Sequence, residues 1–417
     1  MNFLYNCGIR LYNAAIIAVS PFHAKAAKMI TGRKETFSVL AAKLTPGRQR
    51  VWIHAASLGE FEQGRPLIER IRAERPDLEI VLTFFSPSGF EVRKNYDGAD
   101  AVVYLPADTP KNARRLLDTI NPVAVVFVKY EFWGNFLSEI NRRDIPLFLI
   151  SSIFRPQQIF FKPWGGCFRK LLRCFTAIFT QDDASTRLIS PLTESEVTTT
   201  GDTRFDRVSQ ICDSAITTPA LEEFTAAAPG PILIAGSSWP QDEDIYIPWV
   251  NKQSGVRLII APHEFNAERI EKLRKRINGK CVTLSEIESG KTSAADAKCV
   301  IIDCFGRLSG LYRYADIALI GGGFGAGIHN ILEAGVYGMP VVFGPNYHRF
   351  KEAVDMIACG GGFTFDSPTA FERIMSSLTI PEERKKAGDA ATAYIKTGLG
   401  ATDKIWDTVN RHLPDND

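Results

Sequence analysis

Residues 315–345 constrain the fold of this 417-residue chain more than any other segment. A short apolar run at 317–320 is followed at once by five glycines at 321–327, and then by a helical pattern at 329–334. A second apolar run at 340–343 closes the segment. Short apolar runs between turn residues are typical of buried strands, so the pattern predicts a strand, a glycine loop, a helix and a strand.

The glycine loop predicts a nucleotide site. Glycines such as Gly325 and Gly327 let an anion approach the backbone, and the N–H groups at a helix start suit a phosphate. Asn330 and Glu333 lie about one helical turn apart, so they share a face where a carboxylate can accept hydrogen bonds from a ribose diol. A plain glycine-rich turn is the alternative, but His329, Asn330 and Glu333 directly after the loop favour a nucleotide.

Composition limits the classes of protein that this chain can belong to. Its length suggests two or three domains, and 45% apolar and 23% charged residues are ordinary for a globular protein. A net charge of +2 argues against a general binder of polyanions, so no nucleic-acid partner is expected. The eight cysteines form no CxxC pair, which argues against a disulfide framework and against a zinc site.

Strand–helix alternation predicts the α/β class with two doubly wound domains. Short apolar runs alternate with helical segments in the first half of the chain, and the alternation restarts after a polar, irregular stretch that ends near residue 230. Ligands bind at the carboxyl ends of the strands in such sheets. We therefore expect the two domains to face each other across a cleft.

The first twenty-two residues predict an amphipathic helix. Phe3, Leu4, Leu11 and Ile17 are apolar, but Arg10 and several asparagines argue against a full bilayer span. Lysines and arginines follow between residues 25 and 50, a pattern typical of an interfacial anchor on an anionic leaflet. The alternative is a core helix packed on its own domain.

Two glutamates follow predicted strands of the first domain. Glu60 lies where the first predicted strand ends and the first predicted helix begins, and a carboxylate there can act as a general base. The alternative is that Glu60 serves the helix dipole, and the local sequence alone favours this alternative. Glu131 follows another strand and is either a site residue or a partner that holds a loop.

Basic residues alternate with aromatic residues between 153 and 175. Arg155, Lys162 and Arg169 are interleaved with phenylalanines and Trp164. Such a segment could bind nucleic acid or a phosphorylated lipid, or it could be an amphipathic helix whose aromatic side is core. In the second half, Ser237, Ser238 and His263 follow predicted strands and could bind a phosphate, although His263 could also cap its strand.

Five motifs in order resemble those of bacterial 3-deoxy-D-manno-octulosonic acid (Kdo) transferases of lipopolysaccharide synthesis. They are WIHAASLGE at 52–60, YEFWGN at 130–135, GDTRFD at 201–206, AGSS at 235–238 and the glycine segment at 321–333. The resemblance implies a GT-B glycosyltransferase that moves Kdo from CMP-Kdo to a lipid A precursor, lipid IVA. It further implies an inverting reaction that needs neither a metal nor a cofactor beyond CMP-Kdo as donor substrate.

The resemblance also implies roles for residues. Glu60 would be the catalytic base, and Asn330 and Glu333 would bind the ribose. With the predictions above, the donor-binding set is Gly59, Ser237, Ser238, His263, Gly325, Gly327, His329, Asn330 and Glu333. The acceptor-binding set is Ser57, Glu131, Arg155, Lys162 and Arg169. The family pattern is altered at Trp239, Pro262, Gly323, Ile328, Ile331 and Ala334, which bears on the phosphate contacts.

The sequence predicts five segments. They are an interfacial membrane-anchor helix at 1–30, an acceptor-binding Rossmann-like domain at 31–210, a linker at 211–230, a nucleotide-sugar-binding Rossmann-like domain at 231–395, and a C-terminal helix at 396–417 that could pack back on the N-terminal domain. The protein would lie on the cytoplasmic face of the bacterial inner membrane, held peripherally or by its N-terminus to anionic lipids.

Two other functions fit the same sequence. One is a different GT-B enzyme that uses a UDP-sugar, either a transferase or an epimerase. The other is a non-catalytic, membrane-associated module that binds a nucleotide without turnover, against which Glu60 at the mouth of the predicted cleft argues.

Overall fold

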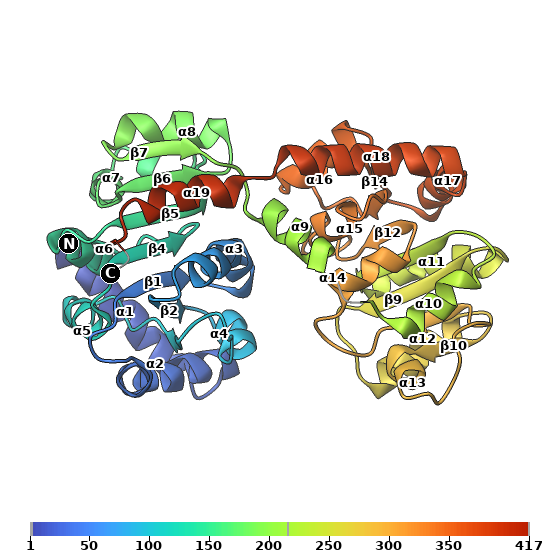
Figure 1. Cartoon of the computed structure of the whole chain (residues 1–417), viewed down its shortest axis with the longest axis horizontal. Helices are drawn as coiled ribbons and strands as arrows, with labels where there is room; N and C mark the ends of the chain where they lie inside the picture. The colour runs from blue at the N-terminus through green and yellow to red at the C-terminus, as the bar shows by residue number, and fades with distance from the viewer. Residues whose placement is uncertain (1–2, 215–216, 416–417) are drawn as a thin grey trace. The chain divides into compact units, whose positions relative to one another are not determined.

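The computed structural model describes residues 3–214 and 217–415 and divides into two compact units. The first unit contains residues 1–207 and 399–417, and the second contains residues 208–398. Each unit is a parallel seven-stranded sheet with helices on both faces (Figure 1). The predicted α/β class is therefore confirmed.

The first sheet has the strand order β3-β2-β1-β4-β5-β6-β7. Its strands are β1 (Arg50–Ala55), β2 (Glu79–Phe84), β3 (Ala101–Tyr104), β4 (Ala124–Val128), β5 (Leu147–Ser152), β6 (Ala177–Thr180) and β7 (Glu196–Thr199). Its helices are α1 (Phe3–Val19), α2 (Ala24–Lys43), α3 (Leu58–Glu74), α4 (Pro87–Arg93), α5 (Pro110–Ile120), α6 (Gly134–Arg142), η1 (Ile159–Phe161), α7 (Gly166–Leu172), α8 (Asp183–Ile189), η2 (Ser190–Leu192) and α19 (Ala401–Asn410). Helix α9 (Arg204–Ser214) begins in the first unit and ends in the second.

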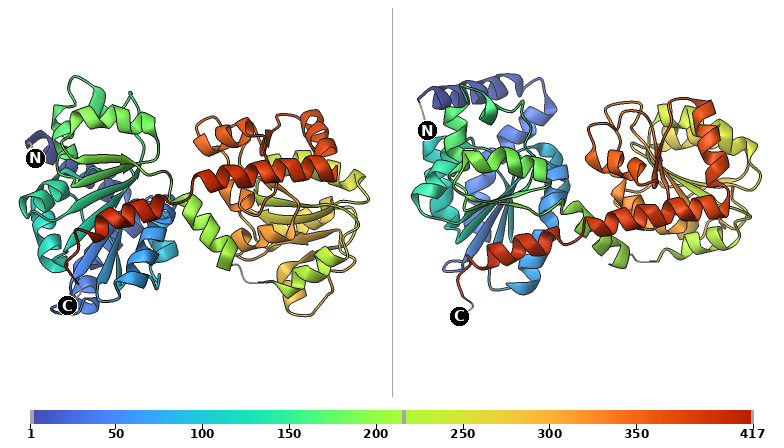
Figure 2. Two further views of the ribbon diagram at one scale, coloured as in Figure 1. Left: turned by 45° about the horizontal axis from the view of Figure 1, so that its top comes forward. Right: turned by 90° about the horizontal axis from the view of Figure 1, so that it is seen from above.

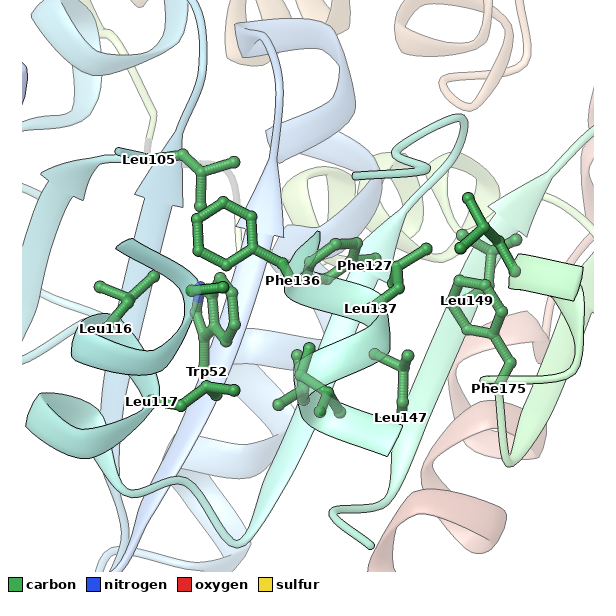
Figure 3. Close-up of a cluster of buried hydrophobic side chains, with 14 of the residues drawn as sticks. Trp52, Leu105, Leu116, Leu117, Phe127, Phe136, Leu137, Leu147, Leu149 and Phe175 are labelled. Atoms are coloured by element: carbon green, nitrogen blue, oxygen red, sulfur yellow. The ribbon is translucent and has the colours of Figure 1, made fainter. Parts of the chain in front are cut away.

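Side chains of the first sheet alternate between two apolar cores, as the period of a strand requires. Trp52 and Phe127 point to one face and pack against Leu116, Phe136 and Leu137 of the covering helices (Figure 3). The other core is closed in part by α19, whose Ile405, Trp406 and Val409 are buried with residues of β1 and α3. Both cores fix the carboxyl ends of β1 and β4, where the predicted acidic residues follow.

Helix α19 belongs to the first unit although it is the last helix of the chain (Figures 1 and 2). The indole Nε1–H of Trp406 donates to Glu74 of α3 at 2.7 Å, and the N–H of Gly400 donates to Asp206 at 2.7 Å. Residues 380–412 do not form a single helix. The chain instead forms two helices, because Gly400 has a φ of +90° and ends the helical path before α19.

The second sheet has the order β10-β11-β9-β8-β12-β13-β14. Its strands are β8 (Ile232–Ser238), β9 (Arg257–Pro262), β10 (Cys281–Thr283), β11 (Cys299–Ile301), β12 (Ile317–Ile320), β13 (Val341–Phe343) and β14 (Gly362–Thr364). Its helices are α10 (Pro219–Ala226), α11 (Pro240–Lys252), α12 (Ala267–Arg276), α13 (Leu284–Glu288), α14 (Leu308–Leu311), η3 (Tyr312–Tyr314), α15 (Leu332–Gly335), α16 (Lys351–Ala358), α17 (Pro368–Leu378) and α18 (Pro381–Thr397).

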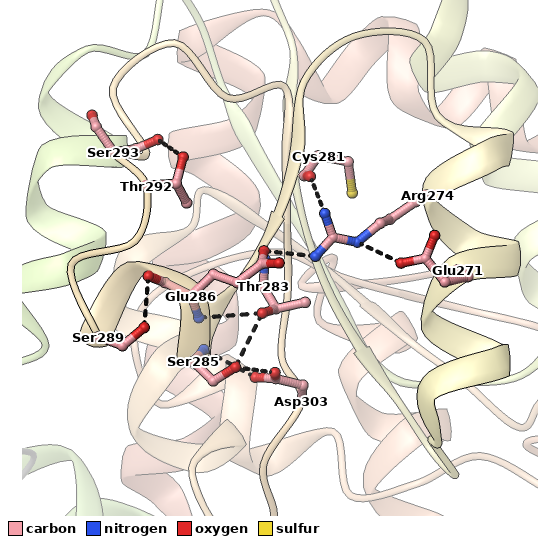
Figure 4. A network of polar contacts seen from close by, with 10 residues as sticks. All are labelled: Glu271, Arg274, Cys281, Thr283, Ser285, Glu286, Ser289, Thr292, Ser293 and Asp303. Atoms are coloured by element: carbon pink, nitrogen blue, oxygen red, sulfur yellow. Dashed lines mark hydrogen bonds and ion pairs between the residues drawn. The ribbon is translucent and has the colours of Figure 1, made fainter.

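A polar network holds the short edge strand β10 in the second sheet (Figure 4). The guanidinium of Arg274 on α12 donates to the carbonyl of Cys281 at 3.0 Å and to the carboxylate of Glu286 at 2.6 Å. The same carboxylate accepts the N–H of Thr283 at 2.9 Å in a capping box of α13. These contacts explain how a strand of three residues is kept at the edge, and they are remote from the glycine loop in sequence.

Candidate functional site

Glu60 lies at the third position of α3, directly after the carboxyl end of β1. Ser57 caps this helix, and the Oε2 atom of Glu60 accepts the backbone N–H of Ser57 at 3.0 Å and its hydroxyl at 3.3 Å. This arrangement is a capping box, so the structural role considered for Glu60 is real. Both of these bonds are made by Oε2, the backbone N–H of Ala56 also acts on the carboxyl group and lowers its pKa, and the side chain is only half-buried. The carboxylate therefore holds the helix through one oxygen and can still accept a proton.

The surroundings of Glu60 favour a carboxyl group that keeps its proton more tightly than usual. Burial raises the pKa of Glu60, the charge of Glu131 raises it further, and His54 and Lys129 oppose the shift. A raised pKa brings a carboxylate closer to the operating pH of a general base. The structure thus brings the two predicted acidic residues into electrostatic contact across the ends of β1 and β4.

Glu131 is held by two ring N–H groups. Its Oε2 atom lies 3.0 Å from Nε2 of the buried His54 and accepts Nε1–H of Trp133 at 2.5 Å. Nδ1 of His54 in turn lies 2.8 Å from the hydroxyl of Thr83 on β2. The hydrogen-bonded series Thr83–His54–Glu131 fixes the carboxylate of Glu131 at the carboxyl ends of β1 and β4, called the first rim below. The sequence analysis gave His54 no role, because its partner is 77 positions away along the chain.

Lys129 is a second residue of this rim that the sequence analysis gave no role. It is the first residue after β4 and has a φ of +72°, which is uncommon for a residue with a Cβ atom. Its charge lowers the pKa of Glu60, so it lies close enough to influence the carboxylate. Backbone strain of this kind is often found at functional sites.

The three predicted acceptor cations do not share one long helix, since Arg155 and Lys162 lie in loops and Arg169 lies on α7. Residues 153–175 form η1 and the short α7, so an amphipathic helix over the whole segment is wrong. Arg155 is exposed and Lys162 is half-buried. The guanidinium of Arg169 donates to the carbonyls of Phe160 at 3.0 Å and Lys162 at 2.9 Å, so in this structure it clamps the loop.

Helix α1 turns its polar side toward the protein and its apolar side outward. The hydroxyl of Tyr5 donates to the buried Asp108 at 2.6 Å and accepts the N–H of Gly134 at 2.9 Å, and Asn6 accepts a side-chain N–H of Asn135 at 2.9 Å. Phe3, Leu4, Leu11, Ile17 and Phe22 are between 57% and 91% exposed. No helix within residues 3–214 and 217–415 is long and apolar enough to cross a bilayer.

In the second unit, the glycine loop after β12 folds back on itself. The N–H groups of Gly325 and Gly327 both donate to the carbonyl of Gly322, at 3.0 and 3.2 Å. Gly322 and Gly327 have φ values of +93° and +130°, which only glycine adopts without strain. The two amides predicted to bind phosphate are therefore already engaged in this structure. The predicted helix also begins later, since α15 runs only from Leu332 to Gly335 and has a weak dipole.

Asn330 and Glu333 are brought together even though Asn330 precedes the helix. A side-chain N–H of Asn330 donates to Oε1 of Glu333 at 3.1 Å, and the carbonyl oxygen of its side chain accepts the N–H of Leu332 at 3.2 Å. The hydroxyl of Ser309 donates to the other oxygen of Glu333. The pair has a fixed geometry and remains half-buried, as a ribose contact requires.

The two predicted serines at the end of β8 lie in different environments. Ser237 is half-buried and has a φ of +51°. Ser238 is 2% exposed, and its hydroxyl is bonded to Tyr246 at 2.9 Å and to the carboxylate of Glu243 at 3.3 Å. The hydroxyl of Ser238 is thus bonded within the interior, which leaves Ser237 as the serine at the carboxyl edge of the second sheet.

In the first unit, Gly59 is exposed, with open space where a Cβ would lie.

His263 and His329 form a cluster of rings with Trp239. The rings of Trp239 and His263 stack at 4.3 Å, and those of His263 and His329 lie 4.7 Å apart. The indole Nε1–H of Trp239 donates to Nε2 of His329 at 3.3 Å, which leaves a proton on Nδ1 of the neutral ring. Burial lowers the pKa of His329 to about 4, and the neighbouring His263 adds to the shift. His329 is therefore a neutral hydrogen-bond donor at neutral pH.

Asp242 holds the glycine loop and had no role in the sequence analysis. Its Oδ2 atom accepts the N–H of Gly322 at 3.1 Å and the N–H of Trp239 at 3.0 Å. Burial raises its pKa to about 6, and its Oδ1 atom is buried without a hydrogen-bond partner. The only sequence signal is its spacing of three residues from Trp239 at the start of α11, which is typical of a helix cap.

Solved structures of similar fold support the class of protein that these two sheets define. UDP-GlcNAc 2-epimerase from Neisseria meningitidis bound to UDP-GlcNAc superposes with a TM-score of 0.59 and 16% identity, covering 87% of this chain and 100% of that chain. The UDP co-structure of MnaA from S. aureus has a TM-score of 0.56 and 12% identity, covering 88% and 100%. At this identity the likeness concerns the fold alone, and the fold is the two-domain α/β architecture of the GT-B class.

Sequence relatives then point to one family within this class. The family model of 3-deoxy-D-manno-octulosonic-acid transferase (kdotransferase) matches residues 31–207. The 3-deoxy-D-manno-octulosonic acid transferase of Bordetella pertussis is 25% identical over 87% of both chains, and that of Aquifex aeolicus is 26% identical over 80% of this chain and 88% of its own. These matches support the Kdo transferase family for this chain, and with it a glycosyltransferase.

Proposed function

We propose that this protein transfers Kdo from CMP-Kdo to a lipid A precursor, lipid IVA, with inversion at the anomeric carbon. Similarity to the Kdo transferase family supports the sugar and the pathway, lipopolysaccharide synthesis. The observation that carries the mechanism is Glu60, because its Oε2 atom caps α3 while its half-buried carboxyl group, with a raised pKa, lies under the charge of Glu131 directly after β1.

The proposed chemical step is a direct displacement. The acceptor hydroxyl attacks the anomeric carbon of Kdo and forms the new C–O bond as its proton passes to the carboxylate of Glu60. The bond from the anomeric carbon to the phosphate oxygen breaks, and its electron pair leaves with CMP. General-base help of this kind contributes roughly a hundred- to ten-thousand-fold in rate.

On the donor side, the proposed ligands are the residues of the second rim. Asn330 and Glu333 would hold the ribose, and their mutual hydrogen bond supports a fixed position for both. His263, neutral His329 and Ser237 would donate hydrogen bonds to the phosphate as charge develops on it. Because the amides of Gly325 and Gly327 are bonded within the loop, they would reach a phosphate only if the loop rearranges. That the reaction needs no metal is part of the proposal.

The proposed location is the cytoplasmic face of the inner membrane, with the protein bound peripherally. Support comes from α1, whose large apolar side chains lie outward while its polar side is bonded to the first unit. An exposed apolar surface of this kind is typical of an interfacial helix, and the lysines and arginines that follow would attract anionic lipids. Liposome flotation with and without residues 1–22 tests this part of the proposal.

The direct test is incubation of the protein with lipid IVA and CMP-Kdo, followed by mass spectrometry of the lipid. The expected result is a mass increase of one or more Kdo units that depends on both substrates. Absence of any product with the intact, folded protein would overturn the proposal. The Glu60→Gln variant in the same assay serves as the control for adventitious transferase in the preparation.

A different donor is the rival that the fold allows, because UDP-sugar enzymes share this architecture. A donor screen separates the two. Titration of the protein with CMP, UDP and their sugar conjugates by calorimetry should show binding of the cytidine compounds. Preference for a uridine compound would favour a UDP-sugar transferase or epimerase, and nucleotide binding without turnover of any acceptor would favour a non-catalytic module.

A further inference from the structure

A cavity of about 440 Å³ lies in the first unit beside Glu131. Its walls come from α1, from the loop after β4, and from η1 and α7, and most of the lining is apolar, including Ile9, Phe132, Ile159 and Phe168. The volume lies within the range of about 300–1,000 Å³ that is usual for sites of small ligands. None of the residues predicted from the sequence to bind the acceptor, apart from Glu131, lines this cavity.

The walls of the cavity are preformed. The ring of Phe132 packs against that of Phe160 at 4.7 Å, and Phe160 lies 6.4 Å from Phe168. The guanidinium of Arg169 fixes the backbone of this loop through the carbonyls of Phe160 and Lys162. On the opposite side, the bonds of Tyr5 to Asp108 and Gly134 hold α1 in place. The cavity is therefore a built feature between fixed elements rather than a gap beside a mobile helix.

We propose that this cavity takes one acyl chain of the acceptor lipid, with α1 as one wall of the acceptor site. The inference rests on the proposed function. A mostly apolar lining that includes one carboxylate, that of Glu131, fits an alkyl chain attached to a polar head. Because the charge of Glu131 also acts on Glu60, the part of the cavity that Glu131 lines lies near the proposed base. A head group whose hydroxyl reaches Glu60 would leave a chain to enter this space.

The surface around the cavity supports an entry from a bilayer. Ile9 lines the cavity, whereas Leu4 and Leu11 on the same helix point outward and are 80% and 71% exposed. Trp164, on the turn between η1 and α7, is 73% exposed. Tryptophans and outward leucines of this kind favour the membrane interface. A chain could therefore pass from the membrane into the cavity along apolar surface.

A kinetic comparison of two acceptors tests the proposal. Ile9→Phe fills part of the cavity, and Leu11→Phe places the same ring on the outward side of the same helix as a matched control. Ile9→Phe should raise KM for lipid IVA about tenfold, as expected when roughly two buried methylenes are displaced. It should leave KM for CMP-Kdo and the rate with fully deacylated acceptor unchanged, and Leu11→Phe should change none of these. Equal effects of Ile9→Phe on both acceptors, or no effect, would overturn the proposal.

A binding measurement without donor or turnover tests the occupant of the cavity independently of the proposed function. Trp133 lines the cavity, so a bromine-labelled medium-chain fatty acid bound there should quench its fluorescence. The quenching should be lost in Trp133→Phe and weakened in Ile9→Phe, but kept in Leu11→Phe. Binding without quenching of Trp133 would overturn the inference. Quenching of Trp133 in a protein that transfers no Kdo would instead overturn the proposed function, and with it the acceptor as the occupant.

Discussion

The two units share one scaffold but differ at the carboxyl edges of their sheets. The order β3-β2-β1-β4-β5-β6 of the first sheet is repeated as β11-β9-β8-β12-β13-β14 in the second, and one extra strand extends each sheet at opposite ends, β7 in the first and β10 in the second. This six-strand order is that of a Rossmann fold. The first edge carries two interacting glutamates with His54 and Lys129, and the second carries the glycine loop with a cluster of rings. The difference shows that the loops after the strands, and not the sheets, decide the chemistry.

One carboxylate at each edge, Glu60 in the first unit and Asp242 in the second, shows the same difference. Glu60 of the first unit caps α3 through Oε2 but remains half-buried directly after β1, which suits proton transfer. Asp242 of the second unit is 1% exposed and bonded to two backbone N–H groups, which suits a structural role. Both have a raised pKa, so a shifted pKa by itself does not distinguish a reactive carboxylate from a structural one.

The largest effect is expected for Glu60→Gln. Glutamine can still make the capping box, so the free energy of unfolding should change little. The amide cannot accept the proton, and kcat should fall by roughly a hundred- to ten-thousand-fold. Stopped-time transfer assays and urea unfolding measure the two quantities. Glu62→Gln, two residues further along the same helix, is the matched control, and a wild-type rate in Glu60→Gln would remove Glu60 from its role.

The next effect is the pH dependence contributed by Asp242. Its pKa is about 6 in the folded protein and near 3.8 otherwise, so the folded state keeps a proton that the unfolded chain has released between these values. Stability should therefore fall as pH rises through this window, by up to about 3 kcal/mol. Asp242→Asn cannot titrate and should lack this dependence. Parallel unfolding curves of the two proteins between pH 4 and pH 6.5 would contradict the structural role of Asp242.

A smaller effect is expected for Glu333→Ala, about a tenfold loss of affinity for CMP, the usual worth of one hydrogen-bonded charged contact. Asn330 would lose its partner as well, so part of the loss would come from its position. Isothermal calorimetry with CMP measures the change. Glu352→Ala on α16 is a control for loss of one carboxylate in the same unit, and unchanged affinity in Glu333→Ala would remove the ribose assignment.

The smallest effect is a shift of the pH–rate profile in Glu131→Gln. Burial is the main cause of the raised pKa of Glu60, and the charge of Glu131 adds to it. Loss of that charge should lower the pKa of Glu60, so the acid limb of kcat/KM should move to lower pH. A limb that stays in place, or moves to higher pH, would show that Glu131 does not act on the base through its charge.

The strands of both sheets were predictable where apolar runs are long enough. The sequence analysis identified the runs that form β1, β2, β4, β8 and β12 from their composition and flanking turns. No strand was predicted at β6, β10 or β14, which contain only three or four residues each. The helix predicted at 329–334 starts too early, since α15 begins only at Leu332.

The site was predictable in part, and the rest depended on distant partners. The adjacency of Asn330 and Glu333 follows from their spacing in the sequence, and the structure brings them together. The roles of His54 and Asp242 depend on partners 77 and 80 positions away, which no local pattern reveals. Likewise, only the structure shows that Arg169 is turned into its own loop and that the hydroxyl of Ser238 is buried. The segment boundaries predicted from sequence remain predictions.

The most direct test of the division of labour between the two units measures transfer rate and CMP-Kdo affinity on the same preparations of Glu60→Gln and Glu333→Ala. We expect opposite results for the two variants. Glu60→Gln should bind CMP-Kdo like the wild type and transfer almost no Kdo, whereas Glu333→Ala should bind weakly but recover most of its rate at saturating donor. Loss of donor affinity in Glu60→Gln together with normal affinity in Glu333→Ala would contradict the account.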